Sequence, residues 1–252
     1  MNVFELEKIL NNKLQADRIK DYAPNGLQVE GQHEIKKIIT GVTASQRLID
    51  AAIAKQADLV LVHHGYFWRN EDMRIINMKY RRIASLIKND INLMGYHLPL
   101  DMAPDIGNNA KIAELLNILD VEALDPMDAQ PLILKGKLKQ PMRGEVFAEI
   151  IEHRFNRKPL HIAPESDKLI STIAWCSGGA QDYIDKAAEF GVDAYLSGEI
   201  SERTTHSARE LDIHYYAAGH HATERYGIEA LGEWLKQEYQ LDVEFIDCDN
   251  PV

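Results

Sequence analysis

An internal repeat constrains this chain more than any other feature, because a duplicated sequence predicts a duplicated unit of fold. Residues 41 to 64 read GVTASQRLIDAAIAKQADLVLVHH, and residues 176 to 199 read CSGGAQDYIDKAAEFGVDAYLSGE. A constant offset of 135 residues brings identical side chains into register: Gln46 with Gln181, Ile49 with Ile184, Asp50 with Asp185, Ala52 with Ala187, Asp58 with Asp193 and Leu61 with Leu196. We therefore expect two related halves.

Both copies of the repeat end in residue types that bind metals. His63 and His64 close the first copy, and Glu199 closes the second. Further along, YHLPLD (96–101) corresponds to GHHATE (219–224). Each of these motifs places a carboxylate four residues after a histidine: His97 with Asp101, and His220 with Glu224. A duplication is expected to bring two such half-sites together at one place.

Strands and helices alternate along the sequence. KKIITGV and ADLVLV read as strands around the helix RLIDAAIAKQ, and TIAWC and DAYLS read as strands around DYIDKAAEF. Strands that are apolar on both faces suit a parallel sheet covered by helices, so we expect an α/β fold with a parallel or mixed sheet. The boundary is placed near residue 125, giving halves of 1–125 and 126–252. No flexible linker separates them, which predicts intimate packing.

Composition excludes several other classes of protein. The formal charge of −11 argues against nucleic acid as a partner, because binding to phosphate backbones depends on Lys and Arg. Two cysteines make no disulfide framework. The amino terminus has the apolar spacing of an amphipathic helix and not that of a signal peptide. No apolar stretch is long enough to span a membrane. We expect a cytoplasmic protein.

The candidate ligands fall where strands are expected to end. His63 and His64 follow the apolar run LVLV, Asp101 follows INLMGY, and His220 with Glu224 follows IHYYAA. Open α/β sheets bind ligands beyond the carboxyl ends of their strands. Neighbouring residues on a strand point to opposite faces, so both histidines reach one site only if the backbone already turns, as Gly65 permits.

Imidazole together with carboxylate suits Zn, Fe, Mn, Co or Ni. Five or six ligands exceed the needs of one tetrahedral ion, so we expect two divalent ions per chain, bridged by a carboxylate. His97 is a ligand, a proton shuttle or a group that orients Asp101. His221 is expected to contact the ligand residues without binding the metal itself. The remaining histidines read as surface or hydrogen-bonded core residues: His33, His153, His161, His206 and His214.

Three alternating lysines form a separate feature of the middle of the chain. Lys135, Lys137 and Lys139 lie on an expected strand, LILKGKLKQ. Lysines that block pairing at the edge of a sheet are one interpretation. A surface that faces phosphates is the other.

The motifs PNGLQVEG, ITGVTAS, ADLVLVHHGYFW, YHLPLD, WCSGGA, DAYLSGEIS and AGHHATE together resemble the NIF-three-like family, also described as GTP cyclohydrolase I type 2 homologues. The resemblance implies two similar, intertwined three-layer α/β/α halves, with a dinuclear metal centre at their interface. It also implies a homo-oligomer, commonly a hexameric ring. Carried over by motif, the metal ligands are His63, His64, Asp101, His220 and Glu224. The large central insertion of some relatives is missing here.

Two functions from different classes follow. The first is a metal-dependent hydrolase of a small nucleotide-like or other heterocyclic molecule, in which His97 or Glu199 moves protons near water activated by the metals. The second is a non-enzymatic, metal-stabilised ring that acts as a scaffold or binding module for a partner protein or a nucleic acid.

Overall fold

The computed structural model describes all 252 residues, and the chain divides into two compact units. The first unit contains residues 1–107 and 227–249, and the second contains 108–226 and 250–252. A single division near residue 125 was predicted instead. The chain crosses between units because its last strand, β11 (Asp242–Phe245), pairs in parallel with β2 (Lys37–Thr43) in the first unit.

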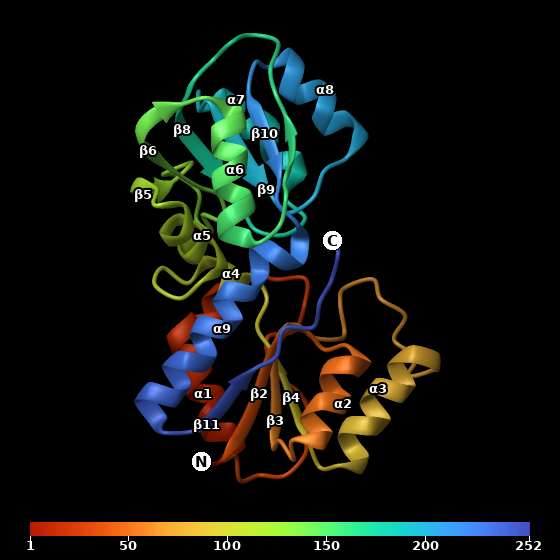
Figure 1. Cartoon of the computed structure of the whole chain (residues 1–252). Helices are drawn as coiled ribbons and strands as arrows, with labels where there is room; N and C mark the ends of the chain where they lie inside the picture. The colour runs from red at the N-terminus through yellow and green to blue at the C-terminus, as the bar shows by residue number, and fades with distance from the viewer. The chain divides into compact units, whose positions relative to one another are not determined.

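A five-stranded mixed sheet forms the centre of the first unit, in the order β1-β4-β3-β2-β11. Strands β2, β3, β4 and β11 are parallel, and β1 is antiparallel to β4 (Figure 1). The other elements of this unit are α1 (Val3–Leu14), η1 (Ala16–Arg18), β1 (Gly26–Val29), α2 (Gln46–Ala54), β3 (Leu59–His64), α3 (Asn77–Lys88), β4 (Asn92–Gly95), α4 (Leu98–Met102) and most of α9 (His220–Tyr239).

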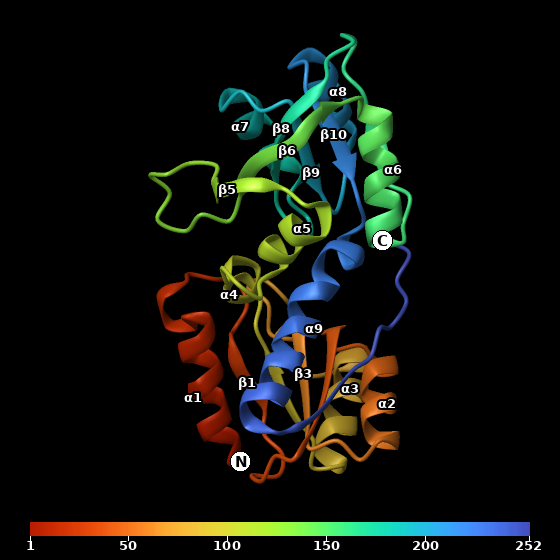
Figure 2. The same ribbon diagram turned by 60° about the vertical axis from the view of Figure 1, so that its left-hand side comes forward.

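Helices cover both faces of this sheet, so the first unit has three layers. One apolar cluster joins α1 and α9 to one face, and alternate strand residues such as Ile38 and Leu61 belong to it. A second cluster joins α2 and α3 to the other face, where Ile39 and Val60 point. The period of two along each strand sends neighbouring side chains to opposite layers. Figure 2 shows α2 and α3 on the opposite side of the strands from α1 and α9.

The second unit repeats this topology around a six-stranded sheet in the order β5-β6-β8-β9-β10-β7. Strands β8, β9 and β10 are parallel, and β7 is antiparallel to β10, as β1 is to β4. The elements are α5 (Asn108–Leu116), β5 (Leu119–Ala123), β6 (Leu134–Met142), α6 (Gly144–Phe155), β7 (Leu160–Ile162), β8 (Ile170–Trp175), η2 (Gln181–Tyr183), α7 (Ile184–Glu189), β9 (Ala194–Ser197), α8 (Glu202–Glu210) and β10 (His214–Ala217). The predicted duplication of an α/β fold is confirmed.

Helix α1 shows how the sequence encodes one of these elements. Its apolar residues Val3, Leu6, Leu10 and Leu14 recur at helical spacing, and all are buried in the first unit. The side-chain oxygen of Asn2 accepts a hydrogen bond from the backbone N–H of Phe4 and caps the amino end. Burial of each large apolar side chain contributes about 1.5–3 kcal/mol, so this helix is held mainly by its packing.

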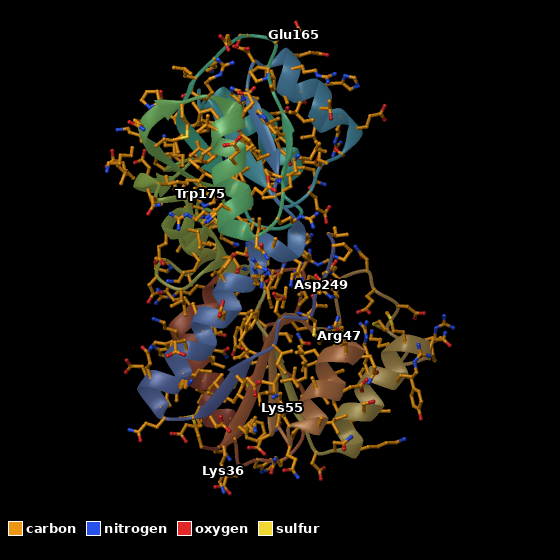
Figure 3. All side chains as sticks on the ribbon, viewed as in Figure 1. Lys36, Arg47, Lys55, Glu165, Trp175 and Asp249 are labelled. Carbon is orange, nitrogen blue, oxygen red and sulfur yellow. The ribbon has the colours of Figure 1, made fainter.

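Trp175 occupies the corresponding interior of the second unit. Its side chain is fully buried, and its indole N–H donates to the carbonyl oxygen of Asn109 over 2.9 Å. In Figure 3 Trp175 lies among the helices and strands of its unit, whereas Lys36 projects from an end of the first unit. No helix combines the length and the apolar character that crossing a membrane requires.

Two local expectations were wrong. Strand β6 carries Lys135 and Lys137 but is not an edge strand, because β5 pairs with its outer side. The two lysines form ion pairs with Glu122 and Asp120 of β5, over 3.4 and 3.1 Å. The turn after the first apolar strand also comes later than expected, since β3 continues through His64.

Candidate metal centre

His63 and His64 are the last two residues of strand β3, at its carboxyl end. The Nδ1 atom of His63 lies 2.9 Å from the carbonyl oxygen of Tyr96. A carbonyl oxygen only accepts, so Nδ1 donates and Nε2 keeps its lone pair. That Nε2 atom lies 3.7 Å from Oδ1 of Asp101, and both side chains are almost fully buried. Asp101 lies on α4, directly after the neighbouring strand β4.

Gly65 makes room for the turn that follows His64. A Cβ atom at this position would lie 2.1 Å from Oε1 of Gln28. The same Oε1 accepts a hydrogen bond from the N–H of Tyr66 over 2.7 Å, so the contact fixes the first residues beyond the turn. Any larger residue at position 65 would displace Gln28 and loosen the end of β3.

His97 follows β4 and is held by a carboxylate that sequence reasoning missed. Nδ1 of His97 lies 2.9 Å from Oδ1 of Asp21, and the side chain of Asp21 is 3% exposed. Asp21 also accepts from the N–H groups of Leu98, Tyr22 and Ala23. An ionised carboxylate has no proton to donate, so His97 donates from Nδ1, and in the neutral form of the ring Nε2 carries the lone pair.

The electrostatics of Asp21 agree with that assignment. Burial raises the pKa of its carboxyl, but the hydrogen bond and charge of His97, with the hydrogen bonds of Asn25 and Leu98, outweigh burial and hold the pKa at about 2. Asp21 is therefore ionised at neutral pH. Its partner lies 76 positions further along the chain, which no local pattern could reveal. The only local signal is the turn that the carboxylate forms at the start of DYAPN.

Three imidazole rings of the first unit pack on one another, those of His63, His64 and His97. The ring centroid of His63 lies 4.4 Å from that of His64 and 5.1 Å from that of His97. One ligand nitrogen from each ring lies within 4.8 Å of the others. We call His63, His64, His97 and Asp101 the first ligand group. The strand therefore brings both neighbouring histidines to one side of the first unit, although it does not turn before His64.

The second unit places its candidates in the same positions of the repeated topology. Glu199 follows β9, and His220 and Glu224 lie near the amino end of α9, after β10. Nδ1 of His220 donates to Oε1 of Glu199 over 2.6 Å, and its Nε2 lies 3.1 Å from Oε2 of Glu224. The expected helix therefore aligns His220 with Glu224. We call these three residues the second ligand group.

Two carboxylates around one imidazole change how His220 titrates. Burial lowers the pKa of His220, but the hydrogen bonds and charges of Glu224 and Glu199 raise it to about 9. His220 is therefore protonated at neutral pH in the absence of a metal ion. A metal ion held by Nε2 of His220 would take the position of that proton, because a metal ligand must be deprotonated.

Gly178 keeps the space beside Glu224 open. Its backbone has a φ of +65°, which few residues other than glycine adopt. A Cβ atom here would lie 2.1 Å from Oε1 of Glu224 and 3.2 Å from Nε2 of His220. The N–H of Gly178 donates to Oγ1 of Thr223 over 3.0 Å, which fixes the loop against α9. Gly178 therefore leaves room beside Oε1 of Glu224 and Nε2 of His220 that a side chain at this position would fill.

The donors of the two groups fit divalent metal ions. Imidazole nitrogens and carboxylate oxygens are the ligands of Zn, Fe, Mn, Co and Ni sites. His63, His97 and His220 each have a hydrogen-bonded Nδ1, which orients the ring and leaves Nε2 to bind. The described residues therefore contain groups that can hold a metal ion, as the sequence predicted.

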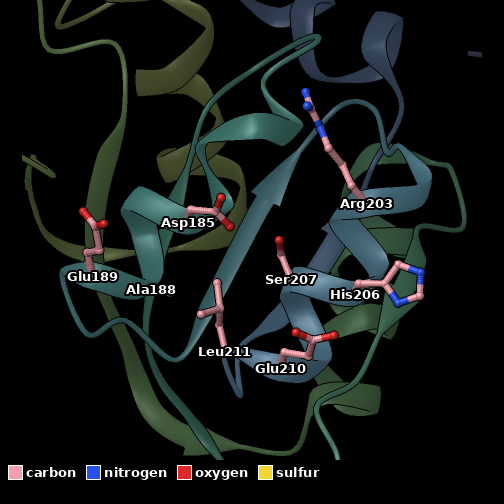
Figure 4. A pocket seen from close by; sticks show the side chains of 8 residues that line it. All are labelled: Asp185, Ala188, Glu189, Arg203, His206, Ser207, Glu210 and Leu211. Atoms are coloured by element: carbon pink, nitrogen blue, oxygen red, sulfur yellow. The ribbon is translucent and has the colours of Figure 1, made fainter.

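Other histidines do not join these groups. His161 donates to or accepts from His214 across 3.0 Å, and Nε2 of His214 donates to the carbonyl oxygen of Lys168. His214 is buried and His161 is partly buried, and both are hydrogen-bonded. His206 lines an open groove of about 690 Å³ between α7 and α8 (Figure 4), and no predicted metal ligand contributes to that groove.

The fold and these groups define a duplicated α/β protein with candidate metal ligands at corresponding strand ends. The chain belongs to the DUF34/NIF3 family, because the family model "Duf34/NIF3 (NGG1p interacting factor 3)" matches residues 1–251. The chain is 58% identical to a Pasteurella multocida protein named "GTP cyclohydrolase 1 type 2 homolog", over the full length of both.

Solved structures agree with this placement. The chain superposes on one described as "Structural genomics, protein ybgI, unknown function" with a TM-score of 0.96 and 52% identity over both whole chains. It superposes on TTHA1606 from Thermus thermophilus with a TM-score of 0.89 and 28% identity, again over both whole chains. The fold of the family is therefore the fold of this chain.

Proposed function

We propose that the chain is a dinuclear metal-dependent hydrolase of a small nucleotide-like or other heterocyclic molecule. The observation that carries the proposal is the pair of ligand groups, which occupy corresponding strand ends of two copies of one topology. His63, His64 and Asp101 from the first copy and His220 and Glu224 from the second would hold two divalent ions. A cytoplasmic location is part of the same proposal.

Bound divalent ions supply Lewis acidity and lower the pKa of water, which is the chemistry that hydrolysis needs. The chain's own residues supply the rest. Nε2 of His97 has a lone pair and is oriented by Asp21, so it can take a proton from a reacting group. Glu199 holds Nδ1 of His220, which favours an orienting role over the proton-transfer role predicted from the sequence.

A panel of substrates tests the proposal. Protein loaded with Mn, Zn, Fe or Ni is assayed against phosphoesters, nucleotides including GTP, and cyclic amides. The printed name of the relatives is the reason to include GTP. We expect turnover of at least one class, abolished in His63→Ala and retained in the exposed control His33→Ala. Silence of the whole panel with every metal would contradict a hydrolase.

A scaffold is the second candidate, and one observation favours it. Large apolar side chains between positions 67 and 80 are exposed: Phe67, Met73, Ile75, Ile76, Met78 and Tyr80. A cluster of this kind is typical of a surface that another protein covers. The nucleic-acid version is weaker, because Lys135 and Lys137 already pair with carboxylates.

Self-association is the form of scaffold that we propose to test, with a homohexameric ring as the expected product. Mass photometry of the parent and of Met73→Glu compares the assemblies. A ring in the parent that dissociates in Met73→Glu would support self-association through this surface. A monomeric parent would exclude the ring.

A further inference from the structure

Two aromatic side chains stand beside the first ligand group. Tyr22 lies in the loop before β1, and Trp68 lies in the loop after β3. Their ring centroids are 5.8 Å apart, at an interplanar angle of 38°. Each ring also makes an edge contact with His97, with centroids 4.9 Å apart in both cases. Trp68 is 5.8 Å from the ring of His64 as well. All four rings belong to the first unit.

Hydrogen bonds fix the loops that carry these rings. The N–H of Arg69 donates to the carbonyl oxygen of Tyr22 over 2.7 Å, which ties the two loops together. The indole N–H of Trp68 donates to the carbonyl oxygen of Gly65 over 3.2 Å. Asp21 accepts from the N–H of Tyr22 over 2.6 Å while it holds His97. The aromatic pair and the imidazole are therefore positioned by the same contacts.

Neither aromatic ring is in the core. Tyr22 is 50% exposed and Trp68 is half-buried, whereas the ligand histidine His63 is 1% exposed. Half-exposed aromatic rings that are already ordered lose little conformational entropy when a ligand binds. Small-molecule sites combine such apolar and aromatic surface with a few polar groups of fixed orientation. The pair next to the imidazoles has this composition.

We propose that Tyr22 and Trp68 form a stacking surface for a planar heteroaromatic ring, next to the first ligand group. The inference rests on the proposed function and specifies the class of molecule that the site would accept. Every heterocyclic base has a π-face, and stacking on an aromatic side chain stabilises a bound base by about 1–3 kcal/mol. Both rings contact that of His97, with centroids 4.9 Å apart, so a ligand stacked on them would lie beside the imidazole of His97.

Binding of simple planar probes tests the surface separately from turnover. Guanosine, adenosine, cytidine and pterin are titrated into the zinc-loaded full chain, with ribose 5-phosphate as the non-planar probe. We expect at least one planar probe to bind, and its Kd to rise about tenfold in Tyr22→Leu and in Trp68→Leu. Tyr22→Phe keeps the π-face and should bind about as tightly as the parent. Tyr183→Leu, at a 41% exposed tyrosine of the second unit, is the matched control.

Two further measurements keep the test decisive. Elemental analysis should show the same metal content in Tyr22→Leu as in the parent, so that a loss of binding is not a loss of metal. Fluorescence of the chain, which has only three tryptophans, should fall on binding and lose this response in Trp68→Leu.

The proposal is overturned if no planar probe binds, or if the probes bind equally well to the two leucine variants. Turnover that is unaffected by either leucine variant would remove the stacking surface and leave the hydrolase. Aromatic-dependent binding without any turnover would remove the hydrolase and leave the stacking surface.

Discussion

The two halves of the chain share a topology and differ in the chemistry at equivalent strand ends. The order β1-β4-β3-β2 of the first unit corresponds to β7-β10-β9-β8 of the second, including the single antiparallel strand at one edge. The first ligand group has three imidazoles and one carboxylate. The second has one imidazole between two carboxylates. The repeated topology therefore places candidate ligands at equivalent strand ends of both halves, but the residue types differ.

The two halves also use different residues to orient the equivalent histidine. In each, the histidine that follows the third parallel strand donates from Nδ1 to a carboxylate: His97 to Asp21 and His220 to Glu199. Asp21 comes from a loop before the repeat, whereas Glu199 comes from the end of β9. Each half therefore orients this imidazole with a carboxylate from a different place in its topology, and an oriented imidazole is a better ligand or base.

Replacing the buried carboxylate of the second group should have the largest effect. The parent is expected to bind about two ions per chain. If Glu224 bridges them, Glu224→Gln should lose both, because a bridging ligand binds each ion. His64→Ala or His220→Ala should lose mainly one ion. Elemental analysis after saturation with zinc measures this difference. Glu229→Gln, at an exposed position of the same helix, is the control. Equal losses in all three ligand variants would exclude the bridging role.

Asp21→Asn should give the next largest effect. The amide keeps the shape of the carboxylate but can present a donor to Nδ1, which removes the fixed orientation of His97. We expect metal affinity to fall about 10–100-fold, as for other partners of ligand histidines. Loss of the buried, charged hydrogen bonds should also cost about 1–3 kcal/mol in the free energy of unfolding. Metal titration and denaturant unfolding measure the two effects, with the exposed Asp17→Asn as control. Unchanged affinity in Asp21→Asn would show that the orientation of His97 does not matter.

The matching change in the second unit, Glu199→Gln, should have a smaller effect. The side chain of Glu199 is 37% exposed and that of Asp21 is 3% exposed. Water can therefore replace more of the hydrogen bonding and charge that Glu199 contributes. We expect a fall in metal affinity of about tenfold or less. The same titration that serves Asp21→Asn ranks the two variants. A larger loss for Glu199→Gln would mean that Glu199 itself binds an ion.

Acid should lower the stability of the two units over different ranges of pH. This is the smallest of the effects predicted here. Burial and the charge of His214 lower the pKa of His161, Glu145 opposes both, and the resulting pKa is about 4. The unfolded chain takes up this proton at a pKa near 6.5, so stability present above that pH is lost as pH falls towards 4. The half-exposed ring limits the loss to about 1 kcal/mol.

In the first unit, Asp21 makes stability depend on pH over a lower range than His161 does in the second. Its pKa is about 2 in the fold against 3.8 in the unfolded chain, so the stability that it adds is complete above pH 3.8 and is lost towards pH 2. Melting temperatures of metal-free protein from pH 7 to 2 measure both effects. His161→Gln should flatten the curve between pH 6.5 and 4, and Asp21→Asn should flatten it below pH 4. A curve for His161→Gln parallel to that of the parent would contradict the first assignment.

The sequence predicted the elements of the fold because their patterns are local. The helices within RLIDAAIAKQ and DYIDKAAEF and the parallel strands with their apolar runs all lie where the sequence predicts them. The repeat also predicted that both copies share a topology. Short strands with no strong pattern, such as β1 and β5, were not expected, and the pairing of β5 changed the position of β6 from edge to interior. Whether such a segment forms a strand depends on pairing partners that lie far away in the sequence.

The candidate site shows the same division between local and distant information. The spacing of His220 and Glu224 on one helix is local, and the structure places them 3.1 Å apart as expected. The contact of Asp21 with His97 joins a loop to a strand end, and neither side reveals the other in sequence. The aromatic contacts of Tyr22 and Trp68 depend on the same distant pairing of loops.

Metal stoichiometry tests the central claim most directly, namely that the two ligand groups together hold two divalent ions. The parent chain is saturated with zinc, separated from free metal by gel filtration, and measured by elemental analysis against its protein concentration. The account predicts about two ions per chain, with one lost in His220→Ala. At most one ion per chain under saturating zinc, unchanged in His220→Ala and Glu224→Gln, would contradict it.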